Sequence, residues 1–377
     1  MKQRACLTAA LLCTLSFSVA AESRDYVFTE APRVADPPSQ QLLDITQAGT
    51  RLVAVGASGL IVVSDDAGTS WVQVASPVSA TLTAVTFAGP REGWAVGHAG
   101  VILHSDDAGE SWSLQFDGRR AIDAFLAYAS GQRRAAEDAL AAAHADEDVT
   151  AAELEALTYA LDDAAFIEEE AQLAVETGPA DPFLDVLFFD ERRGLAVGAY
   201  GMSFATADGG ENWTVNQLGI ENPDRFHLYG LYSDAAGRVV MAGEAGLLYR
   251  SEDGGEHFER FFDVYDGSLF GVVPWAGTAL SFGLRGNLFA YDAAQGVWQE
   301  VVADNDASLY GGAPLDGGGA LLVGAGGVLL RLAPDGRAQR YQHPSRSTFS
   351  AALQASDGVV WLVGMDGLAR LSEAHAR

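Results

Sequence analysis

A short glycine motif recurs along almost the whole chain and limits the folds open to it. Each copy has apolar residues, then Gly-x-x-Gly, then apolar residues again. The steps between successive copies are 41, 101, 45, 40, 41 and 40 residues, so one step is longer than the others and contains an insertion. A repeat of this length is typical of structures assembled from copies of one small unit. The first glycines of the copies are Gly56, Gly97, Gly198, Gly243, Gly283, Gly324 and Gly364.

Each unit contains four short segments with strand character. The second unit shows them best, as "LTAVTF", "GWAVG", "GVILHS" and "SWSLQF", apolar runs bounded by Gly and Asp. Four strands in about 40 residues is the spacing of a propeller blade. The sequence therefore predicts an all-β fold, a seven-bladed β-propeller over residues 21–377.

The last unit has only three such segments before Arg377. The segment "RDYVFTEAPRV", residues 24–34, has strand character and no unit of its own. We predict that it pairs as the outer strand of blade seven, so that an N-terminal strand closes the ring. Closure of this kind removes the exposed edges of an open sheet.

Residues 119–178 interrupt the strand pattern. They are rich in Ala, Glu, Leu and Asp, a helical composition, and Thr150 with Glu153 forms a capping box. An α-helical hairpin between blades two and three is predicted. It follows the outer strand of one blade and precedes the inner strand of the next, on the face that carries the blade crossings and the glycine turns. A docking element or channel cover and a passive lid or stalk both remain open there.

The first 20 residues have the pattern of a signal peptide. Two cations precede an apolar run from Leu7 to Val19, and small residues follow it. This run is shorter than the roughly 20 residues that span a bilayer. We expect cleavage near Ala20/Ala21 and a periplasmic or secreted protein.

The remainder of the chain is acidic and lacks both cysteine and lysine. Cys6 and Cys13 lie in the leader, so disulfides and thiolate chemistry are excluded after its removal. The formal net charge of −28 becomes −30 when Lys2 and Arg4 leave with it. Such a surface repels nucleic acid and anionic lipid. Solubility, a saline medium and a specific cationic partner all remain explanations of this acidity.

Four units carry a Ser/Thr-x-Asp-x-Gly-x-x-aromatic turn that matches the Asp-box of bacterial neuraminidase repeats. The carboxylate can accept backbone N–H bonds, the glycine tolerates positive φ, and the ring packs between sheets. Because the position repeats from blade to blade, we interpret it as structural and not catalytic. The pairs are Asp66 with Trp71, Asp107 with Trp112, Asp208 with Trp213, and Asp253 with Phe258.

The residues between the paired glycines are the candidate binding site. Such turns ring one mouth of a propeller's central channel, where ligands can bind. Tight turns also favour polar residues for local reasons, so a purely structural role remains open. The candidates are Ser58, His98, Tyr200, Glu244, Arg285 and Asp366.

Motifs for catalysis, metals or cofactors are weak or missing. A sialidase needs an arginine cluster beside a Tyr/Glu pair or two opposed carboxylates, and only Arg285 stands at the ring. Tyr200 and Glu244 keep a carbohydrate-active propeller open as the alternative function. The seven histidines show no metal-ligand spacing. We predict no enzyme activity, no metal and no cofactor.

The repeats "GWAVGHAGVILHSDDAGESW" and "GLAVGAYGMSFATADGGENW" resemble the photosystem II stability and assembly factor family of propellers. The likeness spans most of residues 42–377. It implies a non-enzymatic scaffold that holds a membrane-protein complex during assembly. The chain is similar to a subgroup of this family that has an α-helical insertion. The resemblance to that subgroup implies a link to inner-membrane transporters of the resistance-nodulation-division type.

The acidity and the insertion depart from the photosynthetic members, which present a basic patch. The resemblance therefore implies a class of function and not the photosystem itself. We expect an exported scaffold whose crossing face and hairpin dock an envelope or inner-membrane protein complex, without nucleic acid and without a membrane span of its own. Affinity would come from an apolar and aromatic centre.

Overall fold

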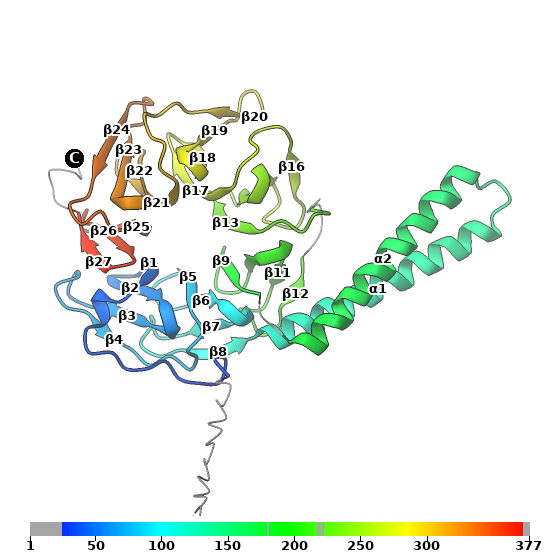
Figure 1. Ribbon diagram of the computed structural model, residues 1–377, viewed down its shortest axis with the longest axis horizontal. Helices are drawn as coiled ribbons and strands as arrows, with labels where there is room; N and C mark the ends of the chain where they lie inside the picture. Colours follow the sequence, from blue (N-terminus) through cyan, green and yellow to red (C-terminus); the bar gives the residue numbers. More distant parts are fainter. Residues whose placement is uncertain (1–24, 179–180, 217–219, 221, 372–377) are drawn as a thin grey trace, which may run out of the picture.

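The computed structural model describes residues 25–178, 181–216, 220 and 222–371. Within them, seven antiparallel sheets surround a common centre, six with four strands and one with three (Figure 1). The predicted seven-bladed β-propeller is confirmed. The predicted signal peptide, residues 1–20, and its cleavage site lie outside the described residues.

Each blade places its strands in chain order from the centre to the rim. Along the chain the strands are β1 (Leu42–Ala48), β2 (Arg51–Gly56), β3 (Ile61–Ser64), β4 (Val72–Gln73); β5 (Leu82–Phe87), β6 (Gly93–Gly97), β7 (Ile102–Ser105), β8 (Ser113–Phe116); β9 (Phe183–Phe188), β10 (Gly194–Gly198), β11 (Ser203–Thr206), β12 (Thr214–Val215); β13 (Leu228–Ser233), β14 (Val239–Gly243), β15 (Leu248–Ser251), β16 (Glu259–Phe261); β17 (Leu269–Trp275), β18 (Thr278–Gly283), β19 (Leu288–Asp292), β20 (Val297–Glu300); β21 (Leu309–Leu315), β22 (Gly319–Gly324), β23 (Val328–Leu332), β24 (Ala338–Gln342); and β25 (Phe349–Gln354), β26 (Val360–Gly364), β27 (Gly367–Arg370).

The core lies between neighbouring sheets. Val53 of blade one packs in one cluster with Val85 and Leu103 of blade two, and all three are buried. Because each sheet is covered on both faces, its second strand is an almost continuous apolar run. Blades seven and one also meet directly, since the Ser350 hydroxyl donates to the Leu42 carbonyl oxygen at 3.0 Å.

The predicted N-terminal closing strand is wrong for the described residues. Residues 25–34 form no strand and run mainly beside blade one. The Gln73 side chain accepts the Val34 N–H at 3.0 Å and donates to the Pro32 carbonyl oxygen at 2.9 Å. Proline has no N–H for a sheet ladder, and this amide supplies both a donor and an acceptor for the irregular backbone. Val34 packs against a buried cluster that blades one and seven share, and the next residues meet blade seven closely, where a Cβ on Gly367 would stand 2.0 Å from the Pro38 carbonyl oxygen.

The predicted helical hairpin is confirmed as α1 (Gly118–Ala145) and α2 (Ala151–Thr177). The capping box of Thr150 and Glu153 is present at the start of α2. The hairpin leaves the ring between blades two and three and extends away from it, so it does not cover the ring's centre (Figure 1). Among the described residues, no helix combines the length and apolar character that crossing a membrane requires.

Candidate binding face at the glycine turns

The paired glycines connect the second and third strands of every blade. A Cβ on Gly97 would stand 2.1 Å from the carbonyl oxygen of Thr81, the residue before the inner strand of the same blade. The equivalent distance is between 2.0 and 2.5 Å in all seven blades. Gly100, the second glycine, has a φ of +63°, which other residues adopt at a cost. The motif repeats because the turn closes directly against the inner strand.

Backbone hydrogen bonds from these turns also join neighbouring blades. In each turn the N–H after the first glycine donates within the blade, as His98 does to the Thr81 carbonyl oxygen at 2.9 Å. In four turns the next N–H donates to a side chain of the following blade. These bonds are Ser58 to Thr81 at 3.4 Å, Tyr200 to His227 at 2.9 Å, Arg285 to Ser308 at 3.1 Å and Gly326 to Thr348 at 3.2 Å.

All six candidate binding residues lie in these turns, on the face of the blade crossings. Two of them are joined through a third residue. The Glu244 carboxylate accepts the His227 N–H at 3.1 Å, and the Tyr200 and His227 rings meet edge to face with centroids 4.9 Å apart. Glu244 is half-buried, and the five exposed candidates are Ser58, His98, Tyr200, Arg285 and Asp366.

An aromatic row continues from His227 along blades four to six. Ring centroids are 5.9 Å apart from His227 to Tyr229, 5.3 Å from Tyr229 to Phe270, and 5.5 Å from Phe270 to Tyr310. The last three residues are each second in an inner strand, beside a β-bulge. We define the aromatic row as Tyr200, His227, Tyr229, Phe270 and Tyr310.

Most of this row was not predicted from the sequence. The predicted binding residues all lie in the glycine turns, whereas Tyr229, Phe270 and Tyr310 come from the inner strands. The signal was present as Leu-aromatic-Gly at the start of three consecutive inner strands: "LYG", "LFG" and "LYG". Tyr200 is 54% exposed and Tyr310 is 40% exposed, so both ends of the row are open to a partner. Amphipathic rings of this kind suit contact with a polypeptide.

Two half-buried carboxylates on inner strands of the ring were also missed. Asp44 accepts the Val85 N–H of the next blade at 2.8 Å, and Asp185 accepts the Leu231 N–H of its next blade at 2.7 Å. Burial raises the pKa of Asp44 to about 6 against the opposing effect of its hydrogen bonds. Burial, helped by repulsion from Asp44, raises the pKa of Asp185 to about 7. Both carboxylates tie inner strands together, and in the described part of the chain no three His, Cys, Asp or Glu side chains are grouped to hold a metal.

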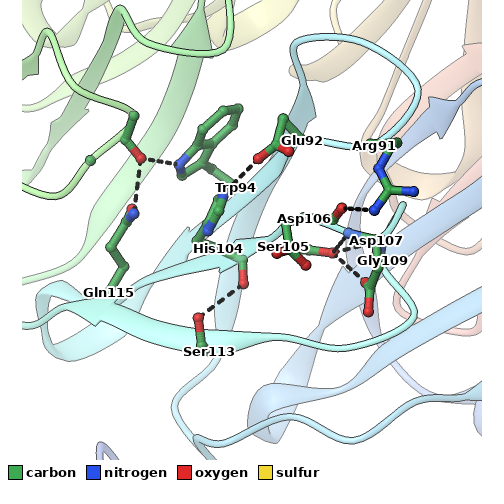
Figure 2. Close-up of polar contacts among 12 residues, drawn as sticks. Arg91, Glu92, Trp94, His104, Ser105, Asp106, Asp107, Gly109, Ser113 and Gln115 are labelled. Carbon is green, nitrogen blue, oxygen red and sulfur yellow. Dashed lines mark hydrogen bonds and ion pairs between the residues drawn. The ribbon is translucent and has the colours of Figure 1, made fainter.

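The four Ser/Thr-x-Asp turns lie on the opposite face, between the third and fourth strands. In blade two the Asp107 carboxylate accepts the Ser105 hydroxyl and the Ser111 N–H, each at 2.9 Å, while the Gly109 N–H donates to the Ser105 hydroxyl at 2.8 Å (Figure 2). The other three turns repeat these bonds. In blade four, donation from the His257 N–H lowers the pKa of Asp253 to about 2.

Side chains of the preceding blade hold these turns from outside. The Trp94 indole and the Gln115 amide both donate to the Gly209 carbonyl oxygen of the blade-three turn, at 3.2 and 2.9 Å (Figure 2). The Asn216 amide reaches the Gly255 carbonyl oxygen of the blade-four turn at 3.1 Å. The turn carboxylates are engaged locally, and the turns themselves are points where blades are joined.

The root of the hairpin is fixed beside the aromatic row. The Asp117 carboxylate caps α1 by accepting two backbone N–H groups of its first turn. Arg225, from the connection between blades three and four, pairs with Glu170 of α2 at 2.5 Å and lies 5.7 Å from the centroid of the Phe125 ring of α1. His227 follows Arg225 by two residues, so the hairpin root and the row are adjacent.

A protein-family model matches this chain. A family model described as photosynthesis system II assembly factor YCF48 matches residues 27–136 and 165–265, more than half of the chain. The photosystem II assembly lipoprotein Ycf48 of Synechococcus sp. (strain CC9902) is 38% identical over 80 residues. This match covers 21% of the chain and 23% of that relative's length.

Solved structures share the fold at low sequence identity. A structure described as YCF48 bound to D1 peptide has a TM-score of 0.57 at 17% identity, covering 91% of this chain and 99% of that one. The GH74 enzyme of Niastella koreensis has a TM-score of 0.57 at 11% identity, covering 88% and 52%. An assembly factor and a glycoside hydrolase thus share this architecture, and the fold alone does not decide between them.

Proposed function

Because this chain belongs to the photosynthesis system II assembly factor YCF48 family, we propose that it is a non-enzymatic scaffold that docks an envelope membrane-protein complex. One relative is described as bound to a D1 peptide, which supports the use of such a disc to hold a polypeptide segment. The acidic surface and the hairpin set this chain apart from the photosystem role. We include in the proposal an inner-membrane transporter of the resistance-nodulation-division type as the partner, and a periplasmic location after loss of residues 1–20.

The proposal is based on a single continuous surface of the protein. It starts at the hairpin root, where Arg225 holds both helices, and continues through His227 along the aromatic row to Tyr310. The candidate turn residues Tyr200 and Glu244 border it. Aromatic residues with polar neighbours are the usual centres of binding energy in protein interfaces. The opposite face offers carboxylates that are already engaged within their own turns.

Affinity capture from membranes tests the proposal. The chain is compared with a version in which a short Gly/Ser linker replaces residues 119–178, and retained proteins are identified by mass spectrometry. We expect an envelope membrane protein to be retained by the intact chain and lost from the shortened one. Circular dichroism of the shortened form should still show a folded β-disc. Equal retention of the membrane protein by both forms would contradict the role assigned to the hairpin.

A second arm tests the aromatic row. Tyr310→Ala should weaken retention about tenfold, because alanine removes a large exposed ring from the end of the aromatic row in the proposed interface. The matched control is Phe262→Ala, since Phe262 is 61% exposed and directly follows β16, the outer strand of blade four, whereas the row comes from glycine turns and inner strands. An equal loss in both variants would show that the row has no special part in binding.

The alternative function is a carbohydrate-active propeller. The observation behind it is that the Glu244 carboxylate lies 3.9 Å from Nδ1 of His227, whose ring meets the Tyr200 ring, so that a carboxylate, an imidazole and a phenol come together. On that hypothesis Glu244→Gln abolishes turnover of a glycan substrate. The scaffold proposal expects no turnover by the unaltered chain across a panel of glycans, and turnover that depends on Glu244 would replace it.

A further inference from the structure

The interior of the hairpin is made of small side chains. Ala129 of α1 and Ala164 and Ala171 of α2 are buried, and they let the two helices approach closely. Polar bonds join the helices at one place, where Glu168 accepts the Ser130 hydroxyl at 2.6 Å and pairs with Arg133 at 2.9 Å. Larger apolar side chains of α2, Leu157, Leu161 and Ile167, are half-buried, so the pairing of α1 with α2 covers part of the large apolar surface and leaves the rest exposed.

Four large apolar side chains of α2 are exposed to solvent; one is Val175, which is 47% exposed, and the other three form a row. Tyr159 is 67% exposed, and Phe166 and Leu173 are each 59% exposed. They are spaced seven residues apart, about 10.5 Å along the helix at 1.5 Å per residue, and so share one face. That face is opposite Ala164, because two residues along a helix correspond to a turn of about 200°. We call Tyr159, Phe166 and Leu173 the outer stripe.

Acidic residues border the outer stripe. Each stripe residue is followed three positions later by a carboxylate, and the first two are also followed by one four positions later, so the acids lie on both sides of the stripe. The helix contains no Lys, Arg or His. The acidic residues of α2 are Glu153, Glu155, Asp162, Asp163, Glu168, Glu169, Glu170 and Glu176.

The negative charge of α2 indicates which kind of molecule can bind the outer stripe. A second copy of the chain would bring acidic α2 against acidic α2, and an anionic lipid surface would be repelled in the same way. Helices that pack side by side use apolar residues at two positions of each seven-residue repeat, and the outer stripe supplies one of the two in each repeat. We propose that the outer stripe binds a cationic amphipathic helix of the partner protein, with apolar residues at heptad spacing between Arg or Lys residues. This inference rests on the proposed scaffold function and names the chemistry of its partner.

The position of α2 suits such a contact. Its root is held by Arg225 through Glu170 and Phe125, while the rest of the hairpin extends away from the disc (Figure 1). A partner helix can therefore lie along α2 without meeting the blades. Because the stripe is fixed on one helix, little order has to be gained on binding.

A synthetic peptide tests the inference directly. The probe is a labelled helix of three heptads, with Leu at each heptad position and Arg flanking it, and its comparison replaces every Arg by Glu. Fluorescence anisotropy with the full chain should show binding of the cationic peptide and at least about tenfold weaker binding of the acidic one. No binding of the cationic peptide, or equal binding of both, would overturn the inference.

Variants separate the stripe from general charge attraction. Changing Tyr159, Phe166 and Leu173 to Ser should weaken peptide binding about tenfold or more while every charge remains. The control changes three exposed apolar residues of the disc that lie outside the glycine turns, Val72, Phe262 and Val302, to Ser. Binding that is unaltered in the stripe variant would overturn the inference, because it would depend on net charge alone.

The failure of this inference is distinguishable from the failure of the proposed function. If deletion of residues 119–178 releases the membrane partner but the stripe variant still retains it, the scaffold function stands and the outer stripe is not its contact. If the deletion releases nothing, the hairpin's part in the proposed function fails first. Retention of the partner by the control variant, together with its loss from the stripe variant, supports both the scaffold function and the contact through the outer stripe.

Discussion

The disc and the hairpin place large and small side chains in opposite ways. In blade two, Leu103 is fully buried between sheets, whereas Leu173 of α2 is 59% exposed and the buried residues of α2 are Ala164 and Ala171. Small residues in the disc stand where backbones meet, as Gly97 does against the inner strand. The difference teaches that the disc buries large apolar side chains between its own sheets, while α2 buries small ones and leaves a row of large ones available to another molecule.

The largest loss of stability is expected at a glycine turn of the disc, where an added Cβ has no room. Gly97→Ala places a Cβ at 2.1 Å from the Thr81 carbonyl oxygen, so the turn or the inner strand must shift. We expect a loss of about 3 kcal/mol or more in the free energy of unfolding, measured by urea denaturation. Gly131→Ala in α1 is the control, since its Cβ meets nothing within 4 Å. It should stabilise or be neutral, and similar losses in both would refute the account of the turn.

The turns on the opposite face should show a smaller effect. Asp107→Ala removes the acceptor of the Ser105 hydroxyl and of the Ser111 N–H. We expect about 2 kcal/mol of destabilisation by the same measurement. Asp106→Ala should change little, because the bond from Arg91 uses the Asp106 backbone carbonyl, which the substitution keeps. A larger loss at Asp106 would contradict the structural role that we predict for the turn carboxylate.

The half-buried carboxylates predict a pH dependence. The folded-state pKa of Asp185, about 7, lies above the usual value, so the folded protein binds this proton more tightly than the unfolded chain does. The contribution of Asp185 to stability therefore grows as the pH falls from about 7 towards 4, and it is lost as the pH rises again. Asp185→Ala should flatten the dependence of unfolding free energy on pH in this window by an amount on the order of 1 kcal/mol. An unchanged slope would show that burial does not perturb this group.

The smallest effect is expected on the outer stripe. Leu173→Ala should alter the unfolding free energy by less than about 0.5 kcal/mol, since the side chain is exposed and alanine favours helix. The same substitution at the buried Leu103 should cost about 2 to 5 kcal/mol. A large loss at Leu173 in thermal or urea unfolding would mean that the stripe serves the fold of this chain and not a partner.

Much of the architecture was predictable because it is repeated. The glycine motif gave the number of blades, and the capping box of Thr150 and Glu153 marked the start of α2. The path of residues 25–34 was not predictable, because strand character in a short segment does not say which edge it will meet. Gln73, whose amide bonds that segment, gave no local sign of this role.

The candidate binding face was likewise predictable only in part. The sequence placed Tyr200 and Glu244 in glycine turns on one face, yet their link through His227 depends on a residue of the blade-four entrance. The aromatic row arises because consecutive inner strands stand side by side around the centre. Residues about 40 apart in the chain thereby come into ring contact.

By itself the sequence determined the blade repeat, the position of the insertion and its helical nature, because these depend on local spacing and backbone preference. Only the tertiary structure decided which side chains became neighbours across blades, which carboxylates were half-buried, and which face of α2 remained uncovered. Those outcomes depend on how the sheets and helices pack, and residues far apart in the chain settle them together.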